Sequence, residues 1–216
     1  PENIRDKISL FCDVEKEAVI PLPTVSTIYE IPLILEEAGL GRLLANKLHL
    51  QMKRKDLTEW RDLVERLKTS HEPVNIALVG KYVELTDAYF SVREALYHAA
   101  LYNDRELNMF WVHSEEIDKN GADTLLRNAQ GIIVPGGFGE RGIEGKIKAA
   151  KYARENEIPY LGLCLGLHVM VIELARYAFN SDEPNSTEFN PSTRYPVIDL
   201  LPEQKKVKIK GATMRL

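Results

Sequence analysis

The stretch Pro159-Tyr160-Leu161-Gly162-Leu163-Cys164-Leu165-Gly166-Leu167 decides the fold. It reads as an apolar strand that runs into a Gly-x-Cys-x-Gly turn, and residues 168–177 then have the pattern of a helix. A nucleophile on a tight strand-to-helix turn needs small neighbours, which Gly162 and Gly166 supply, and a helix N-terminus favours a thiolate. We therefore predict that Cys164 is a catalytic nucleophile. The alternative is a buried structural cysteine at a glycine-rich strand end.

Strands and helices alternate around this turn. The predicted strands cover residues 75–79, 107–112, 131–134 and 160–163. The predicted helices cover residues 87–101, 122–129 and 143–156. This alternation predicts an α/β fold with a mostly parallel, doubly wound sheet, in which the site lies beyond the carboxyl ends of the strands. Both Cys164 and the glycines Gly136 and Gly137 follow such ends.

The residues before position 74 have a different pattern. Short strands are expected at residues 7–11 and 18–22, and a helix at residues 26–37 that Pro32 bends or divides. An apolar turn at 43–48, an amphipathic helix at 57–67 and a linker at 69–73 follow. We expect residues 1–50 to belong to one domain, residues 51–73 to form a linker with a helix, and residues 74–216 to form a second domain that is incomplete at its C-terminus.

Composition excludes several classes of protein. The 216 residues are 44% hydrophobic with a formal net charge of −4, which argues against global disorder and against a basic nucleic-acid surface. The one basic run, 205–210, alternates with apolar residues and is expected to be an exposed strand. Two distant cysteines, Cys12 and Cys164, fit a reducing compartment, and no spacing suggests a metal site. Without a membrane-length apolar run or a signal peptide, a soluble cytoplasmic protein is expected, and both ends suggest a fragment.

A second motif, Pro135-Gly136-Gly137-Phe138-Gly139, could complete a site at Cys164. Glycines allow a close approach to the backbone, so the N–H groups of Gly137 and Leu165 could form an oxyanion hole. Taken alone, the motif could equally be a tight loop. Its position beside the cysteine turn favours the catalytic interpretation.

A thiol nucleophile needs a base, usually a histidine. The chain offers His49, His71, His98, His113 and His168. His168 lies in the helix after the turn and points the wrong way, whereas His113 at a strand end is the least unsuitable candidate. We expect the base to lie outside this chain.

The motifs together resemble a known family. Pro135–Gly139 followed by Gly162–Gly166 is similar to class I glutamine amidotransferases, and more specifically to the CTP synthase family. The supporting segments are Lys7–Cys12, Val25–Pro32, Gly80–Tyr82 with Asp87–Tyr89, Gly136–Gly145, Asn185–Phe189 and Gly211–Leu216.

The resemblance implies a flavodoxin-like amidotransferase domain preceded by the C-terminal part of a P-loop-like amidoligase domain. Members of the family make CTP from UTP, ATP and glutamine: ammonia released at the cysteine reaches a uracil ring whose 4-oxygen ATP has phosphorylated. Mg²⁺ and ATP act as cofactors, GTP is an activator, and glutamine, UTP, ATP, GTP and CTP are the small-molecule partners. The family is cytoplasmic and tetrameric, so a homo-oligomer without nucleic-acid or membrane partners is implied.

The resemblance also implies residue roles. Cys164 is the nucleophile, and Glu188 would hold the α-amino group of glutamine. Glutamine would also contact Gly137, Leu165, Gly166, Leu167 and His168, and the activating GTP and its lid would involve Phe138, Arg141 and Glu144. The pyrimidine nucleotide would contact Lys7 and Phe11, and the ATP base would contact Pro23, Thr24 and Val25.

Departures from the family pattern leave alternatives open. His168 stands where the family usually has Gln, and Pro23 where it often has Lys. The catalytic His and Glu and a glutamine-binding Arg follow the last segment in the family, and the phosphate loop with the Mg²⁺ ligands precedes the first. The alternatives are a glutaminase domain serving another synthetase, a thiol hydrolase of the same fold, and a catalytically decayed regulatory paralogue.

Overall fold

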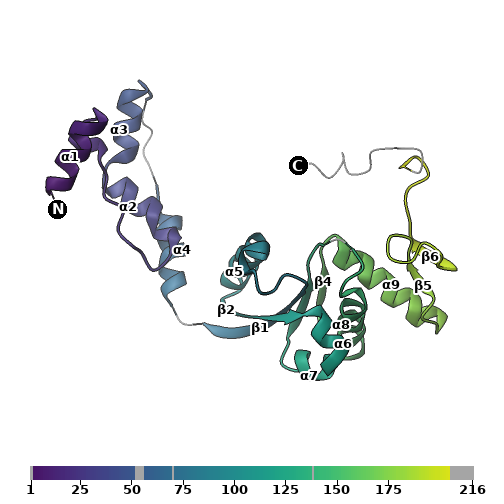
Figure 1. The fold of residues 1–216 in the computed structure, drawn as a ribbon. Coiled ribbons are helices and arrows are strands. Elements are labelled where there is room, and N and C mark those ends of the chain that lie inside the picture. Colours follow the sequence, from purple (N-terminus) through teal and green to yellow (C-terminus); the bar gives the residue numbers. More distant parts are fainter. Residues whose placement is uncertain (1, 52–55, 70, 138, 205–216) are drawn as a thin grey trace. The chain divides into compact units, whose positions relative to one another are not determined.

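The structure is a computed structural model that describes residues 2–51, 56–69, 71–137 and 139–204 (Figure 1). The chain divides into two compact units, Pro1–Ser70 and His71–Leu216. The strand expected at residues 205–210, the segment Gly211–Leu216 and Phe138 lie outside the described residues. None of the described helices is long and apolar enough to span a bilayer.

The first unit is helical in its described part. Its elements are α1 (Glu2–Cys12), η1 (Lys16–Ala18), η2 (Ile28–Glu30), α2 (Ile31–Glu37), α3 (Leu40–Lys47) and α4 (Thr58–Lys68). The indole N–H of Trp60 on α4 donates to the carbonyl of Tyr29 on η2 at 2.8 Å, which ties these two segments together.

Several expectations for this unit were wrong. Residues 7–11 belong to helix α1 rather than to a strand, because a short apolar run fits either period. Residues 18–22 form the end of η1 and irregular chain, and the turn expected at 43–48 lies mostly in α3. The predicted division of the helix at 26–37 is confirmed: Pro32 lies in the first turn of α2, where its missing N–H is not needed.

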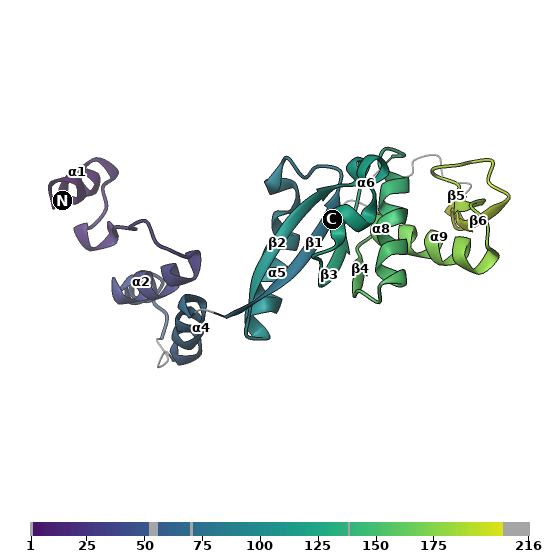
Figure 2. The same ribbon diagram turned by 90° about the horizontal axis from the view of Figure 1, so that it is seen from below.

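The second unit is built on a parallel sheet, as predicted. Its strands are β1 (Glu72–Gly80), β2 (Arg105–His113), β3 (Gly131–Val134) and β4 (Tyr160–Gly162). Their order across the sheet is β2-β1-β3-β4, and every pairing is parallel (Figure 2). The linker expected at 69–73 already contains the start of β1.

Alternating side chains of the strands serve the two faces of the sheet. Ala77, Val79, Val112, Ile132 and Val134 pack with residues of α6 (Ser114–Asn120), α7 (Ala122–Leu126) and α8 (Ile143–Glu155). Intervening residues point to the other face. There the ring centroids of Trp111 and of Tyr89, in η3 (Thr86–Tyr89), are 6.0 Å apart, and α5 (Phe90–Tyr102) packs on β2. The sheet is therefore covered on both faces, as the predicted doubly wound fold requires.

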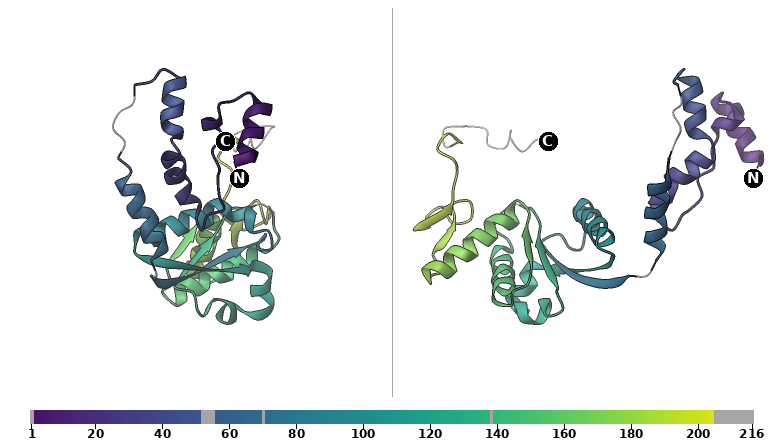
Figure 3. Two further views of the ribbon diagram at one scale, coloured as in Figure 1. Left: turned by 90° about the vertical axis from the view of Figure 1, so that its left-hand side faces the viewer. Right: turned by 180° about the vertical axis from the view of Figure 1, so that it is seen from behind.

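The second unit ends with α9 (Leu165–Phe179), followed by a small parallel pair, β5 (Pro184–Ser186) and β6 (Tyr195–Ile198), which packs on α9 (Figure 3). Helices α8 and α9 share an apolar cluster that includes Ile147, Leu165 and Val169. This packing fixes the start of α9, and with it Cys164, against the start of α8. The helix expected at residues 122–129 is shorter than predicted, and α6 was not predicted.

Candidate active site

Cys164 lies at the junction between β4 and α9 and is exposed. Its backbone has φ 54° and ψ −109°, a conformation that residues with a side chain rarely adopt and that strains the chain locally. In a strained strand-to-helix turn of this kind, the side chain of the nucleophile is exposed at the edge of the sheet. The thiol is thus accessible at the N-terminus of a 15-residue helix.

The glycines on each side of Cys164 make this turn possible. A Cβ at Gly162 would overlap the backbone of Gly166, and a Cβ at Gly166 would overlap the carbonyl of Val134 on β3. The hydroxyl of half-buried Tyr160 donates to the carbonyl of Gly166 at 3.0 Å, and desolvation raises the pKa of this phenol above its ordinary range. The turn is therefore packed directly onto two neighbouring strands, which is why residues larger than glycine do not fit there.

The loop after β3 lies beside the cysteine. A Cβ built on Gly136 would lie 3.9 Å from Cys164 Sγ, and one built on Gly137 would lie 3.5 Å from a methyl carbon of Leu165. The N–H groups of Gly166, Leu167 and His168 donate to Leu163 and Cys164 carbonyls, whereas within the described chain no acceptor is recorded for the Leu165 N–H. The structure thus brings together the two loops that the sequence predicted to meet.

Lys146 is a residue that the sequence analysis missed. It lies in the first turn of α8 with only 1% of its surface exposed, and its Nζ is 3.5 Å from the point where a Gly137 Cβ would lie. Burial and the nearby Lys81 lower its pKa from 10.5 to about 8. A sequence signal existed: Lys146 lies three residues after Ile143 and four before Ala150, on the apolar side of its helix.

The histidines do not provide a base for Cys164. His113 is the last residue of β2, which lies at the opposite edge of the sheet from β4, so three strand spacings of together about 14 Å separate the two strands. Its Nδ1 accepts the N–H of Glu115 at 3.2 Å and caps α6. His168 is half-buried on α9, and its Nδ1 is buried without a hydrogen-bond partner among the described residues. No described histidine is hydrogen-bonded to the Cys164 thiol.

The residues expected to contact glutamine occupy two places. Leu165, Gly166, Leu167 and His168 form the first turn of α9 beside Cys164. Glu188 is exposed in the loop between β5 and β6, where its N–H donates to Ser186 Oγ at 3.1 Å. No recorded contact joins the Glu188 side chain to the cysteine turn within the described part of the chain.

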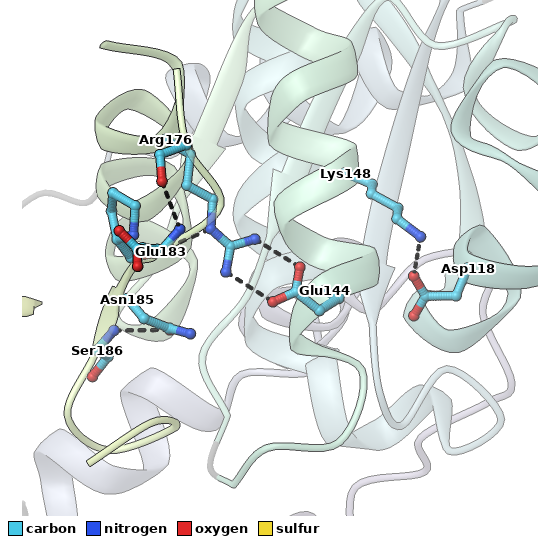
Figure 4. Close-up of polar contacts among 9 residues, drawn as sticks. Asp118, Glu144, Lys148, Arg176, Glu183, Asn185 and Ser186 are labelled. Atoms are coloured by element: carbon cyan, nitrogen blue, oxygen red, sulfur yellow. Dashed lines mark hydrogen bonds and ion pairs between the residues drawn. The ribbon is translucent and has the colours of Figure 1, made fainter. Parts of the chain in front are cut away.

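The residues expected at the lid hold helices together. Arg141 Nε lies 2.9 Å from a carboxylate oxygen of Glu115 on α6. The Glu144 carboxylate accepts hydrogen bonds from Nη1 and Nη2 of Arg176 on α9 at 2.7 and 2.9 Å (Figure 4). Glu144 also lines a polar groove between α8 and α9 that contains neither Cys164 nor Gly137. Figure 4 also shows Lys148 of α8, whose Nζ donates a hydrogen bond to Asp118 of α6.

The residues expected to bind nucleotides lie in the first unit. Lys7 and Phe11 are exposed on α1, and Pro23, Thr24 and Val25 lie in the extended segment between η1 and η2. In the part of the chain that the structure describes, no group of three or more His, Cys, Asp or Glu side chains could hold a metal ion. Lys7, Phe11, Pro23, Thr24 and Val25 include no carboxylate, so their side chains do not supply the ligands that Mg²⁺ prefers.

Comparisons with known proteins match both units. The family model "Glutamine amidotransferase class-I" matches residues 84–216, and the model "CTP synthase N-terminus" matches residues 1–50. The glutaminase domain of Trypanosoma brucei CTPS with bound acivicin is similar at 41% identity with a TM-score of 0.57, covering 61% of this chain and 51% of that one.

Relatives match along the whole chain. It is 65% identical over 215 residues to a CTP synthase of Dehalococcoides mccartyi and 52% identical over 221 residues to one of Methanocaldococcus jannaschii. In each case 100% of this chain is covered but only 40% and 41% of the relative, so the chain spans about two fifths of the length of these curated relatives. The chain belongs to the class I glutamine amidotransferase family and, within it, to the CTP synthases.

Proposed function

We propose that this chain is the part of a CTP synthase that carries the glutamine-hydrolysing nucleophile. The observation that carries the proposal is the strained, exposed Cys164 at the start of α9, with the Gly136–Gly137 loop beside its sulfur. A thiol next to backbone donors is suited to attack on a carboxamide. Glutamine is the amide that the family acts on.

In the proposed reaction, the Cys164 thiolate forms a bond to the side-chain amide carbon of glutamine. The carbonyl electron pair moves to oxygen, where the N–H groups of Gly137 and Leu165 stabilise the negative charge. The oxyanion then re-forms the carbonyl as the C–N bond breaks, and the amide nitrogen leaves as ammonia with the proton that the base took from the thiol. Water, deprotonated by the same base, then cleaves the thioester to glutamate and the free Cys164 thiol. We assign the base to a segment outside this chain, because no described histidine is hydrogen-bonded to the Cys164 thiol.

We assign substrate recognition to the neighbouring residues. Gly166, Leu167 and His168 would contact glutamine, and the Glu188 carboxylate would pair with its α-ammonium group, a strong charge-assisted interaction. His168 would replace the usual Gln as a hydrogen-bonding residue, and its buried Nδ1 has no hydrogen-bond partner among the described residues. Phe138, Arg141 and Glu144 would lie near an activating GTP.

The first unit would complete the synthetase site. Lys7 and Phe11 would contact the pyrimidine of UTP, and Pro23, Thr24 and Val25 the ATP base. ATP would phosphorylate the uracil 4-oxygen, and ammonia would displace the phosphate to give CTP. The proposal places residues 1–50 in the amidoligase domain, 51–73 in the linker and 74–216 in the amidotransferase domain of a cytoplasmic homotetramer, with Mg²⁺ bound outside this chain.

The test separates the two half-reactions in the complete synthase. Replacing Cys164 by Ala should reduce glutamine-dependent CTP formation by at least ~10³-fold while ammonia-dependent formation continues, since the thiol is needed only to release ammonia. Cys12→Ala is the matched control and should behave as wild type. Glutamine-dependent CTP formation that survives in Cys164→Ala would refute the assignment.

The same assay addresses the alternatives. A glutaminase serving another synthetase, or a thiol hydrolase, would show no UTP-dependent ATP hydrolysis, and a decayed paralogue would make no CTP from glutamine. The match of residues 1–50 to a CTP synthase N-terminus favours the proposed function over the first two.

A further inference from the structure

Lys146 has an environment that lysines rarely occupy. It is 1% exposed, and none of the ion pairs recorded among the described residues involves its ammonium. Burying a charge without a counter-charge is unfavourable, and a methionine would fill the same space without that penalty. The position therefore calls for an explanation other than packing.

The surrounding charges leave the Lys146 ammonium uncompensated. On the elements packed against α8 the nearby carboxylates are already paired, Glu115 with Arg141 and Asp118 with Lys148 from α6, and Glu173 with Arg154 on the α9 side. On α8 itself, Glu144 pairs with Arg176. Lys81, which follows β1, carries the same sign as Lys146 and repels it.

The Gly136–Gly137 loop lies beside both the Lys146 ammonium and the Cys164 thiol. The Nζ of Lys146 is 3.5 Å from the Cβ position of Gly137, and the Cβ position of Gly136 is 3.9 Å from Cys164 Sγ. A cation close to a thiol favours the thiolate, and it also stabilises an oxyanion that forms at the same loop.

We propose that Lys146 is a positioning residue for the reaction at Cys164, whose ammonium supports the Gly136–Gly137 loop and supplies positive potential to the thiolate and the oxyanion. No proton leaves Lys146 in this role. The inference rests on the proposed glutaminase function, because it gives the oxyanion a substrate. It adds a residue that the resemblance did not imply.

The test follows alkylation of Cys164 by iodoacetamide against pH in the complete synthase, with mass spectrometry to resolve each cysteine. Lys146→Met should slow alkylation of Cys164 several-fold at neutral pH and move its profile towards higher pH. Lys148→Met, an exposed lysine on the same helix, should leave the profile unchanged. Exposed Cys12 reports in the same sample and should not change in either variant.

Kinetics provide a second readout. Lys146→Met should lower kcat for glutamine-dependent CTP formation by about tenfold with little change in the KM for glutamine, because the charge acts on the reacting carbonyl. Ammonia-dependent formation should continue, which also shows that the variant is folded. Should Lys146→Met not fold, Lys146→Gln is the second neutral variant.

An unchanged Cys164 profile in Lys146→Met would overturn the inference, as would failure of both neutral variants to fold, which would indicate a purely structural lysine. These outcomes differ from failure of the proposed function. In that case, Cys164→Ala would retain glutamine-dependent CTP formation whatever the behaviour of Lys146.

Discussion

Two residues at the start of two helices concentrate the unusual physical chemistry of this chain. Cys164 has a backbone conformation that strains the turn, and Lys146 is a charged group with 1% exposure. Both features reduce stability, and both occur around the same glycine loop. Local unfavourable features that gather at one place are typical of functional sites.

The buried lysine makes the stability of the chain depend on pH. The folded-state pKa of Lys146 is about 8, against 10.5 in an exposed lysine, so between these values the unfolded chain binds more protons and the free energy of unfolding rises with pH. Lys146→Met should therefore be more stable than wild type by about 2–3 kcal/mol below pH 7.5, and the difference should shrink towards pH 10.5.

Urea unfolding followed by Trp111 fluorescence, with Trp60 replaced by Phe in both proteins, measures this difference in the second unit. Titrating groups that Lys146 does not influence contribute equally to both proteins and cancel in the comparison. A stability difference that stays constant from pH 7 to pH 10 would contradict the lowered pKa.

At the scale of elements, the contact between α8 and α9 aligns the helix that carries Cys164. Arg154 of α8 holds Glu173 of α9 through hydrogen bonds of 2.8, 3.0 and 3.2 Å, and the Glu173 side chain is only 5% exposed. The Arg154 guanidinium also lies 3.9 Å from the centroid of the Tyr177 ring. This is a bidentate pair in a largely desolvated position, where ion pairs have their largest effect.

Removing one partner of that pair should destabilise the second unit. Glu173→Ala should lower the free energy of unfolding by about 2–3 kcal/mol, because it leaves Arg154 partly buried without its carboxylate. Glu155→Ala is the matched control: its ion pairs with Lys151 at 3.9 Å and with Arg154 at 3.6 Å are longer and Glu155 is half exposed, so their loss should change stability by less than about 0.5 kcal/mol. Equal urea midpoints for the two variants would contradict the role given to Glu173.

The elements differ in how far the sequence could predict them. The apolar strands 75–79 and 131–134 are unambiguous because they contain continuous apolar runs that are mostly buried. Helix α6 was missed because Ile117 is its one large apolar residue, so the sequence has no helical period, and its formation depends on the His113 cap and on burial of Ile117. Residues 7–11 alternate as a strand would, yet Ile4 and Ile8 also have the spacing of a helix.

The residues of the site also differ in how far the sequence could predict them. Cys164 and Gly137 could be predicted to meet because each follows a parallel strand, and the carboxyl ends of such strands gather at one edge. The burial of Lys146 could not be read from the residue type, because lysines are usually exposed. The pairs of Arg141 with Glu115 and of Glu144 with Arg176 depend on tertiary packing that no local pattern encodes.

At the scale of the whole molecule, the chain joins two units that match different parts of one family. The helical unit carries the CTP synthase N-terminus match, and the α/β unit carries the amidotransferase match. The proposed reaction needs both, since ammonia made in one unit is consumed by chemistry to which the other contributes. The proposed function is therefore tested most directly at the nucleophile, Cys164.

The decisive measurement is the site of covalent labelling of the complete synthase by a diazo-ketone analogue of glutamine, read by peptide mass spectrometry. We expect modification of Cys164, protection by glutamine, and loss of glutamine-dependent but not ammonia-dependent CTP formation. Labelling of a different residue, with Cys164 unmodified, would contradict it.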